Sequence, residues 1–272
     1  MSPHRHSARM RLADDYDGLV VVAEDQVEGG AHVLDLCVAL TERQDEDEQM
    51  RQVAKRVSLT QPAPIQIDST EPEVIRTALE QIPGRAIVNS INLEAGRDKA
   101  DVVVPLAIEH GAALIALTID EVGMAKSRED KVRIARRLVE FACGRFGLPL
   151  SDLLIDPLTF TICTGNEDDR KLALWTLEAI EDLRALFPDL QLILGLSNVS
   201  FGLNPAARHV LNSVILDHAM RRGLTGAIVH SSKIIPLHKI PAAEVQAAED
   251  LIFDRRAEGY DPLQAFIALF AD

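Results

Sequence analysis

Polar residues that donate or accept hydrogen bonds follow a series of short apolar runs along this chain. Most of them are carboxylates or carboxamides, and the last is a histidine. If the apolar runs are parallel strands, their carboxyl ends share one edge of the fold, and the polar side chains converge on one site. Such a ring is costly to bury unless a ligand supplies partners. The residues are Asp35, Asp68, Asn89, Asp120, Asp156, Asn198 and His230.

The residue types in this ring indicate what it binds. Any one of them alone could simply cap a helix or anchor a loop. Carboxylates together could bind a hard cation. Asn89 and Asn198, however, offer donors and acceptors at once, which suits a polar heteroaromatic ring. A carboxylate that faces two adjacent N–H groups of an aminopyrimidinone makes a charge-assisted paired contact. We therefore expect a heterocyclic ligand and no bound metal, with a cation site as the alternative.

Other chemistries lack their sequence signatures. The chain has no nucleophile elbow, no glycine-rich phosphate loop, no HExxH and no CxxC. Its three cysteines are odd in number and widely spaced, which predicts neither a disulfide framework nor a zinc site. A reducing, cytoplasmic location is therefore expected.

Composition excludes further classes of protein. The chain has 272 residues, with 28 Lys and Arg against 42 Asp and Glu, for a formal net charge of −14. This acidic balance argues against nucleic-acid binding, which relies on a basic face. No apolar run approaches the ~20 residues that span a membrane. The polar, basic start of the chain is not a secretory signal.

The elements that position the ring are read from hydrophobic patterning. Short, continuously apolar runs are typical of parallel strands buried on both faces. Amphipathic segments, such as 130–146 and 168–187, lie between them, and this alternation is typical of βαβ units. The seven runs are 32–35, 64–68, 86–89, 114–120, 153–156, 192–198 and 227–230.

This alternation predicts a TIM-type (β/α)8 barrel that lacks a visible first strand. A closed barrel has eight strands in about 250 residues. Here a helix predicted over 17–29 precedes the first run, and no apolar run precedes that helix. We expect an irregular segment over 1–16, a barrel over 17–241 and a helical extension over 242–272. The missing strand would leave unpaired edges, which another segment or a second copy of the chain would cover. We therefore expect a homo-oligomer.

Four motifs on these strand ends resemble a known family. They are Ile67-Asp68-Ser69, Ile87–Ile91 (IVNSI), Asp156-Pro157 and Gly195–Phe201 (GLSNVSF), in that order. They are similar to the pterin-binding domain shared by cobalamin-dependent methionine synthase and the methyltetrahydrofolate:corrinoid protein methyltransferases. The resemblance runs from about Gly18 to the end of the chain.

The resemblance implies a function for the ring. It implies a methyltransferase that binds 5-methyltetrahydrofolate at the barrel mouth and transfers its N5 methyl to cob(I)alamin or a corrinoid protein. Asn198 would lie near N5, and Asn198 and Asp156 would stabilise the charge that develops as the methyl leaves. The pterin-binding positions would be Asp35, Asp68, Asn89, Asp156, Asn198 and Arg208. Positions beside the ligand or its anionic tail would be Asp120, Ser200 and Lys233.

The chain also departs from the family pattern. The family's first strand carries Gly-Glu-Arg-x-Asn, and nothing in 1–16 matches it. Cys37 stands where the family usually has an asparagine on the next strand. The corrinoid-binding Asp-x-His-x-x-Gly motif is absent from the sequence given. We therefore expect the corrinoid on a partner chain, or on another module of a larger synthase.

Two alternatives remain open. The missing motif and Cys37 are also compatible with a non-catalytic pterin-binding or scaffold protein. A dihydropteroate synthase-like enzyme on the same fold is less favoured, because the sequence shows no basic cluster suited to a pyrophosphate.

Overall fold

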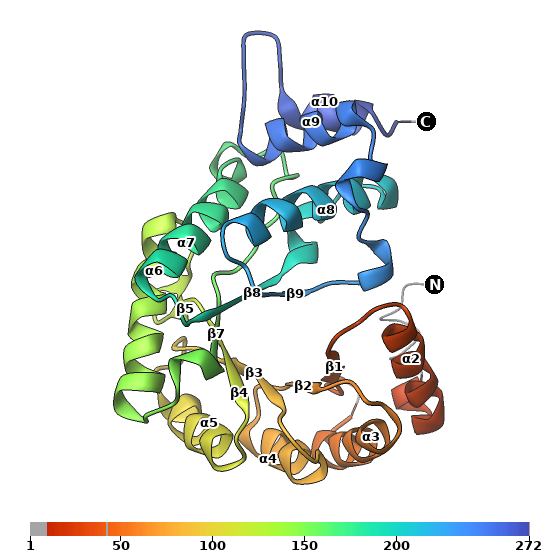
Figure 1. The fold of residues 1–272 in the computed structure, drawn as a ribbon, viewed down its shortest axis with the longest axis vertical. Coiled ribbons are helices and arrows are strands. Elements are labelled where there is room, and N and C mark those ends of the chain that lie inside the picture. Colours follow the sequence, from red (N-terminus) through yellow and green to blue (C-terminus); the bar gives the residue numbers. More distant parts are fainter. Residues whose placement is uncertain (1–9, 42, 272) are drawn as a thin grey trace.

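Seven parallel strands form the centre of the protein. The computed structural model describes residues 10–41 and 43–271. Its main sheet has the strand order β1-β2-β3-β4-β7-β8-β9, so each strand pairs with its neighbour along the chain (Figure 1). The strands are Leu34–Cys37 (β1), Ile65–Asp68 (β2), Ile87–Ile91 (β3), Ala113–Leu117 (β4), Leu153–Asp156 (β7), Gln191–Gly195 (β8) and Gly226–Ile228 (β9).

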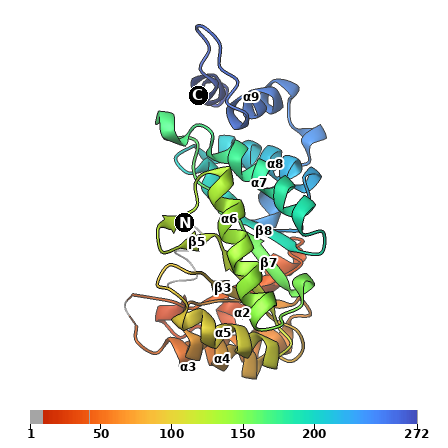
Figure 2. The ribbon, with the colours of Figure 1, turned by 90° about the vertical axis from the view of Figure 1, so that its left-hand side faces the viewer.

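Helices surround this sheet on its outer side, as the two views of the ribbon show (Figures 1 and 2). Capping chemistry fixes where several begin. Asn204 accepts a hydrogen bond from the Ala207 amide at 2.9 Å and is followed by Pro205, so α8 starts there. The helices are Tyr16–Glu28 (α2), Glu46–Thr60 (α3), Pro72–Gln81 (α4), Asp98–Glu109 (α5), Arg128–Val139 (α6), Leu172–Leu186 (α7), Pro205–Arg221 (α8), Ala242–Ile252 (α9) and Pro262–Ala268 (α10).

The sheet curls into a nearly closed barrel of the TIM type, which confirms the predicted fold class. In the described residues β1 and β9 do not pair with each other, and no strand precedes α2. The two sides of this seam meet through side chains. The Ser231 hydroxyl, after β9, donates across it to the Gly29 carbonyl, after α2, at 2.9 Å. On the β1 side, the Arg11 guanidinium donates to the Cys37 carbonyl at 2.8 Å.

Successive strand residues point to opposite faces, so each strand supplies both the core and the barrel interior. The outward set packs under the helices and is aliphatic. Ile67, Val88, Leu114, Ile155 and Leu192 are each 0% exposed. Burial of such side chains is the main stabilising term for a sheet covered by helices.

Several predicted elements are divided in the structure, and the run 192–198 is β8 followed by the short helix Leu196–Ser200 (η4). The run 114–120 is not one strand, because β4 ends at Leu117 and Ile119–Asp120 (β5) turns into an antiparallel hairpin with Gly123–Met124 (β6). The Thr118 amide still bonds the Asp156 carbonyl at 3.0 Å, and the chain then leaves the sheet. The helix predicted over 130–146 is α6 followed by a π-helical segment, Glu140–Arg145.

The helical C-terminal tail is present, as predicted. Helices α9 and α10 lie at the end of the molecule beyond α8 (Figure 1). His218 of α8 bonds Glu249 of α9, with 2.8 Å between Nε2 and Oε1. None of the described helices is both long and apolar enough to cross a bilayer.

Candidate functional site

Asp68 and Asn89 lie side by side at the mouth of the barrel. They are register partners at the carboxyl ends of β2 and β3, and Cys37 of β1 is the partner of Asp68 on the other side. All three therefore share the inner face of the sheet. Burial raises the pKa of the Asp68 carboxyl, and the hydrogen bond from the Cys37 thiol opposes that rise.

Asp35 lies one layer deeper than predicted. The sequence placed it at the end of the first strand, but β1 continues to Cys37, and Asp35 pairs with Gln66 two residues before Asp68. The Gln66 amide donates to Asp35 Oδ1 at 2.8 Å. Burial in the barrel interior raises the pKa of Asp35 to about 6, the charge of Asp68 adds to this, and the Gln66 bond opposes it.

This raised pKa makes a stability prediction for Asp35→Asn. An unfolded aspartate has a pKa of about 3.9, so the folded protein binds the Asp35 proton more tightly and loses stability as pH rises from about 4 to about 6. Removing the charge should raise the melting temperature near pH 8 by about 2 °C and leave it unchanged near pH 4. The gain stays small because water reaches Asp35 and screens its charge. Thermal unfolding across pH measures it; a gain of equal size at both pH values would contradict it.

Asp156 closes β7 and is the most enclosed carboxylate of the mouth. The residue is 7% exposed, and its Oδ1 accepts a hydrogen bond from the Leu158 amide at 2.7 Å. Burial raises the pKa of Asp156 to about 6, whereas the Leu158 and Gly195 amides and the charge of Lys131 oppose this rise. The carboxylate is thus held by backbone donors and retains acceptor capacity for a ligand.

Lys131 was not among the predicted site residues, although it lies under the loop that follows Asp156. It is 0% exposed, and its Nζ donates to the Pro157 carbonyl at 2.6 Å. A helical lysine is normally assumed to face solvent. Helical spacing could have predicted its burial. Lys131 lies three, four and seven residues before the other buried residues of α6, which are Ile134, Ala135 and Leu138.

Asn198 lies in the short helix Leu196–Ser200 (η4) that follows β8, and its side chain is exposed. Arg208 of α8 supports this segment. Its Nε donates to Ser200 Oγ at 3.1 Å and its Nη2 donates to the Ser197 carbonyl at 3.2 Å. The structure therefore links Arg208 and Ser200 directly and makes both of them supports of the turn that carries Asn198.

Basic side chains gather after β9, on the same side of the barrel. Lys233 ends the short helix Ser231–Lys233 (η5) and is exposed, as is His230. The pKa of His209 in α8 is lowered, first by burial and then by the positive charges of Lys233, Arg208 and His230. These groups form a local positive region on an acidic protein.

Asp120 lies apart from the strand-end ring. Its side chain is 2% exposed and its Oδ2 accepts from Arg133 at 2.8 Å and from Arg137 at 2.9 Å. The Val122 amide donates to its other oxygen at 3.1 Å. The hydrogen bond from Arg133 is the main cause of its lowered pKa. Asp120 therefore anchors the β5–β6 hairpin to α6.

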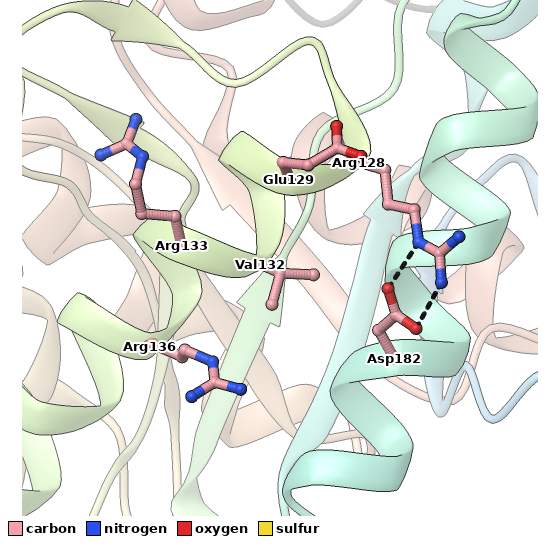
Figure 3. A pocket seen from close by; sticks show the side chains of 6 residues that line it. All are labelled: Arg128, Glu129, Val132, Arg133, Arg136 and Asp182. Atoms are coloured by element: carbon pink, nitrogen blue, oxygen red, sulfur yellow. Dashed lines mark hydrogen bonds and ion pairs between the residues drawn. The ribbon is translucent and has the colours of Figure 1, made fainter.

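A cavity of about 380 Å³ opens elsewhere, on the outer wall between α6 and α7 (Figure 3). Arg128 and Asp182 form a two-point ion pair across it, at 2.6 and 2.8 Å. None of the ring residues lines it. Within residues 10–41 and 43–271, no three His, Cys, Asp or Glu side chains are grouped closely enough to hold a metal ion.

Methionine synthases are among the proteins that this chain is similar to. The chain is 47% identical over 262 residues to methionine synthase of Mycobacterium tuberculosis, and equally so to that of Mycobacterium leprae. Each alignment covers 95% of this chain but 22% of the relative, so the chain spans about a fifth of the length of these relatives.

Solved structures show the same fold. A dihydropteroate synthase from Xanthomonas albilineans in complex with 7,8-dihydropteroate superposes with a TM-score of 0.59 at 18% identity, covering 83% of this chain and 86% of that one. The enzyme from Thermus thermophilus gives 0.56 at 23% identity, covering 79% and 83%. The family described as pterin binding enzyme matches residues 1–230. The chain therefore belongs to the pterin binding enzyme family.

Proposed function

We propose that this chain binds 5-methyltetrahydrofolate, with the pterin ring in the barrel mouth and the glutamate tail toward solvent. The observation that carries the proposal is the register pair Asp68 and Asn89 on β2 and β3, combined with the enclosed carboxylate of Asp156 on β7. Two carboxylates and an amide on one inner face complement the N–H groups and acceptors of a pterin edge. The identity to methionine synthases supports the same ligand.

We propose further that the bound folate is a methyl donor. N5 is a tertiary amine and a poor leaving group, so it needs a proton or a strong hydrogen bond as the methyl departs. Asn198, held by the turn that Arg208 supports, is the residue we assign beside N5. Asp156 would orient the ring and contribute to the same polar network. A cobalt(I) corrinoid on a partner chain or another module would supply the nucleophile.

Two measurements test this function in order. Titration calorimetry with 5-methyltetrahydrofolate should show one binding site. Absence of binding at millimolar ligand would contradict the proposed function. Absorbance spectroscopy should then show cob(I)alamin turning into methylcobalamin when protein and methyltetrahydrofolate are both present. Binding without that conversion would leave the non-catalytic pterin-binding alternative in place.

Lys233 gives a separate prediction about the folate tail. Lys233→Ala should weaken binding of a polyglutamylated methyltetrahydrofolate about two- to fivefold, the usual size of an exposed ion pair. The loss should shrink at high salt because an exposed pair is screened. Lys239→Ala, which removes another exposed lysine after β9, is the matched control. Equal effects of the two variants in calorimetry would remove Lys233 from the site.

A further inference from the structure

Lys131 is a buried cation whose contacts converge on the loop after Asp156. Its Nζ donates to three backbone carbonyls, at 3.0 Å to Ala125, 2.6 Å to Pro157 and 3.2 Å to Leu158. The Phe160 ring adds a cation–π contact at 5.0 Å from its centroid. A fully buried lysine is rare and costly, so this arrangement calls for a reason.

The three acceptors select the charged form of the amine. An ammonium offers three N–H donors, which matches three carbonyls, whereas a neutral amine has two donors and a lone pair. Burial lowers the pKa of Lys131 to about 7, and the negative charge of Asp156 works against that fall. The charge of Lys131 in turn works against the rise in the pKa of Asp156.

The loop that Lys131 holds is the one that orients Asp156. Leu158 has φ of +67°, a left-handed conformation that is unfavourable for a residue with a Cβ atom. Its carbonyl accepts from Lys131 and also from the Thr176 hydroxyl at 3.0 Å. Its amide donates to Asp156 Oδ1 at 2.7 Å. Two buried side chains therefore stabilise the turn that places this donor.

We propose that Lys131 is a positioning residue, whose buried ammonium fixes the Pro157–Leu158 turn and supplies the positive charge that keeps the Asp156 carboxylate oriented and ionised for the ligand. The role of that carboxylate in binding rests on the proposed function. The coupling between Lys131 and Asp156 does not, because it belongs to the free protein.

The coupling is measured on the ligand-free protein. Isotope-labelled aspartate followed by NMR across pH gives the titration of Asp156, assigned from its absence in Asp156→Asn. In Lys131→Met and Lys131→Gln the pKa of Asp156 should rise by about one pH unit, the usual effect of losing a nearby opposite charge. Lys131→Gln retains two N–H donors for the carbonyls and is the variant that best preserves the fold.

Thr176→Val separates charge from loop support. It removes a hydrogen bond to the same Leu158 carbonyl and leaves the charge in place, so the pKa of Asp156 should rise by less than in Lys131→Gln. An equal rise in the two variants would overturn the role of the Lys131 charge. The reciprocal titration needs no substitution at Lys131. Because coupling is reciprocal, Asp156→Asn should lower the pKa of Lys131 by the same amount, followed through labelled lysine.

Ligand binding completes the test. Near pH 6.5 Lys131→Gln should weaken methyltetrahydrofolate binding about threefold beyond any loss seen near pH 8.5, because less Asp156 is ionised at the lower pH. Unchanged titrations of both Asp156 and Lys131 would overturn the proposal. If the wild-type chain binds no folate yet the titrations shift as stated, the proposed function fails and the Lys131–Asp156 coupling stands.

Discussion

Asp156→Asn is expected to weaken 5-methyltetrahydrofolate binding about a hundredfold. The Leu158 amide already donates to one oxygen of this side chain, so an asparagine would keep its oxygen there and turn its NH2 toward the ligand. A donor would then face the pterin's own N–H groups. Loss of a charge-assisted bond together with an unpaired buried donor costs about 2–3 kcal/mol, which is about two decades in affinity.

Calorimetry on matched variants checks this result. Asp189→Asn makes the same charge change at an exposed residue before the amino end of β8 and should bind like the wild type. The Asp156 variant should remain folded, because burial of the carboxylate already disfavours its charged form and raises its pKa. A folded Asp156→Asn protein with wild-type affinity would remove this residue from the proposed site.

The second large effect concerns stability. Asp120→Ala is expected to lower the free energy of unfolding by about 2–3 kcal/mol. The Asp120 carboxylate is buried and bonded to Arg133, Arg137 and the Val122 amide, so its removal detaches the β5–β6 hairpin from α6. The cost stays below that of a fully buried triad because both arginines reach water, with side chains 47% and 36% exposed.

Glu121→Ala is the matched control, since Glu121 also pairs with Arg137 but is 52% exposed. It should cost less than about 1 kcal/mol in urea unfolding. The contribution of Asp120 to the free energy of unfolding should also depend on pH. Its folded pKa is lowered, so the stabilisation is complete above about pH 4 and is lost as pH falls through the folded pKa. An equal loss of unfolding free energy in Asp120→Ala and Glu121→Ala would contradict the prediction that the buried carboxylate contributes more.

The sequence predicted the strands of this barrel better than the side chains between them. Each of the seven apolar runs overlaps a strand of the sheet, and β7 has the predicted bounds. Parallel strands under helices are apolar on their outer face, so their existence is local information. Asp35 was predicted at the end of the first strand, but β1 continues through Leu36 and Cys37. An apolar pattern does not show at which residue the hydrogen bonding of a strand ends.

The sequence pattern could not predict side-chain contacts between residues that are distant along the chain. Asp120 ends an apolar run like the others. Its ion pairs, however, are with Arg133 and Arg137 on the following helix, and it lies apart from the ring. Lys131 reaches carbonyls 26 and 27 positions away. Residue type and spacing predict which face of a helix is buried, but not which loop a buried charge will meet. The ligand roles of Asp68, Asn89 and Asn198 remain predictions.

The seam between β1 and β9 lies apart from the strands that carry the proposed ligand-binding residues. Asp68, Asn89, Asp156 and Asn198 lie on or directly after β2, β3, β7 and β8, which β4 joins into one continuous hydrogen-bonded ladder. A wider seam would separate β1 from β9 and leave these four groups at fixed distances from one another. The proposed binding residues therefore lie on strands away from the two unpaired edges, so a movement at the seam need not disturb their arrangement.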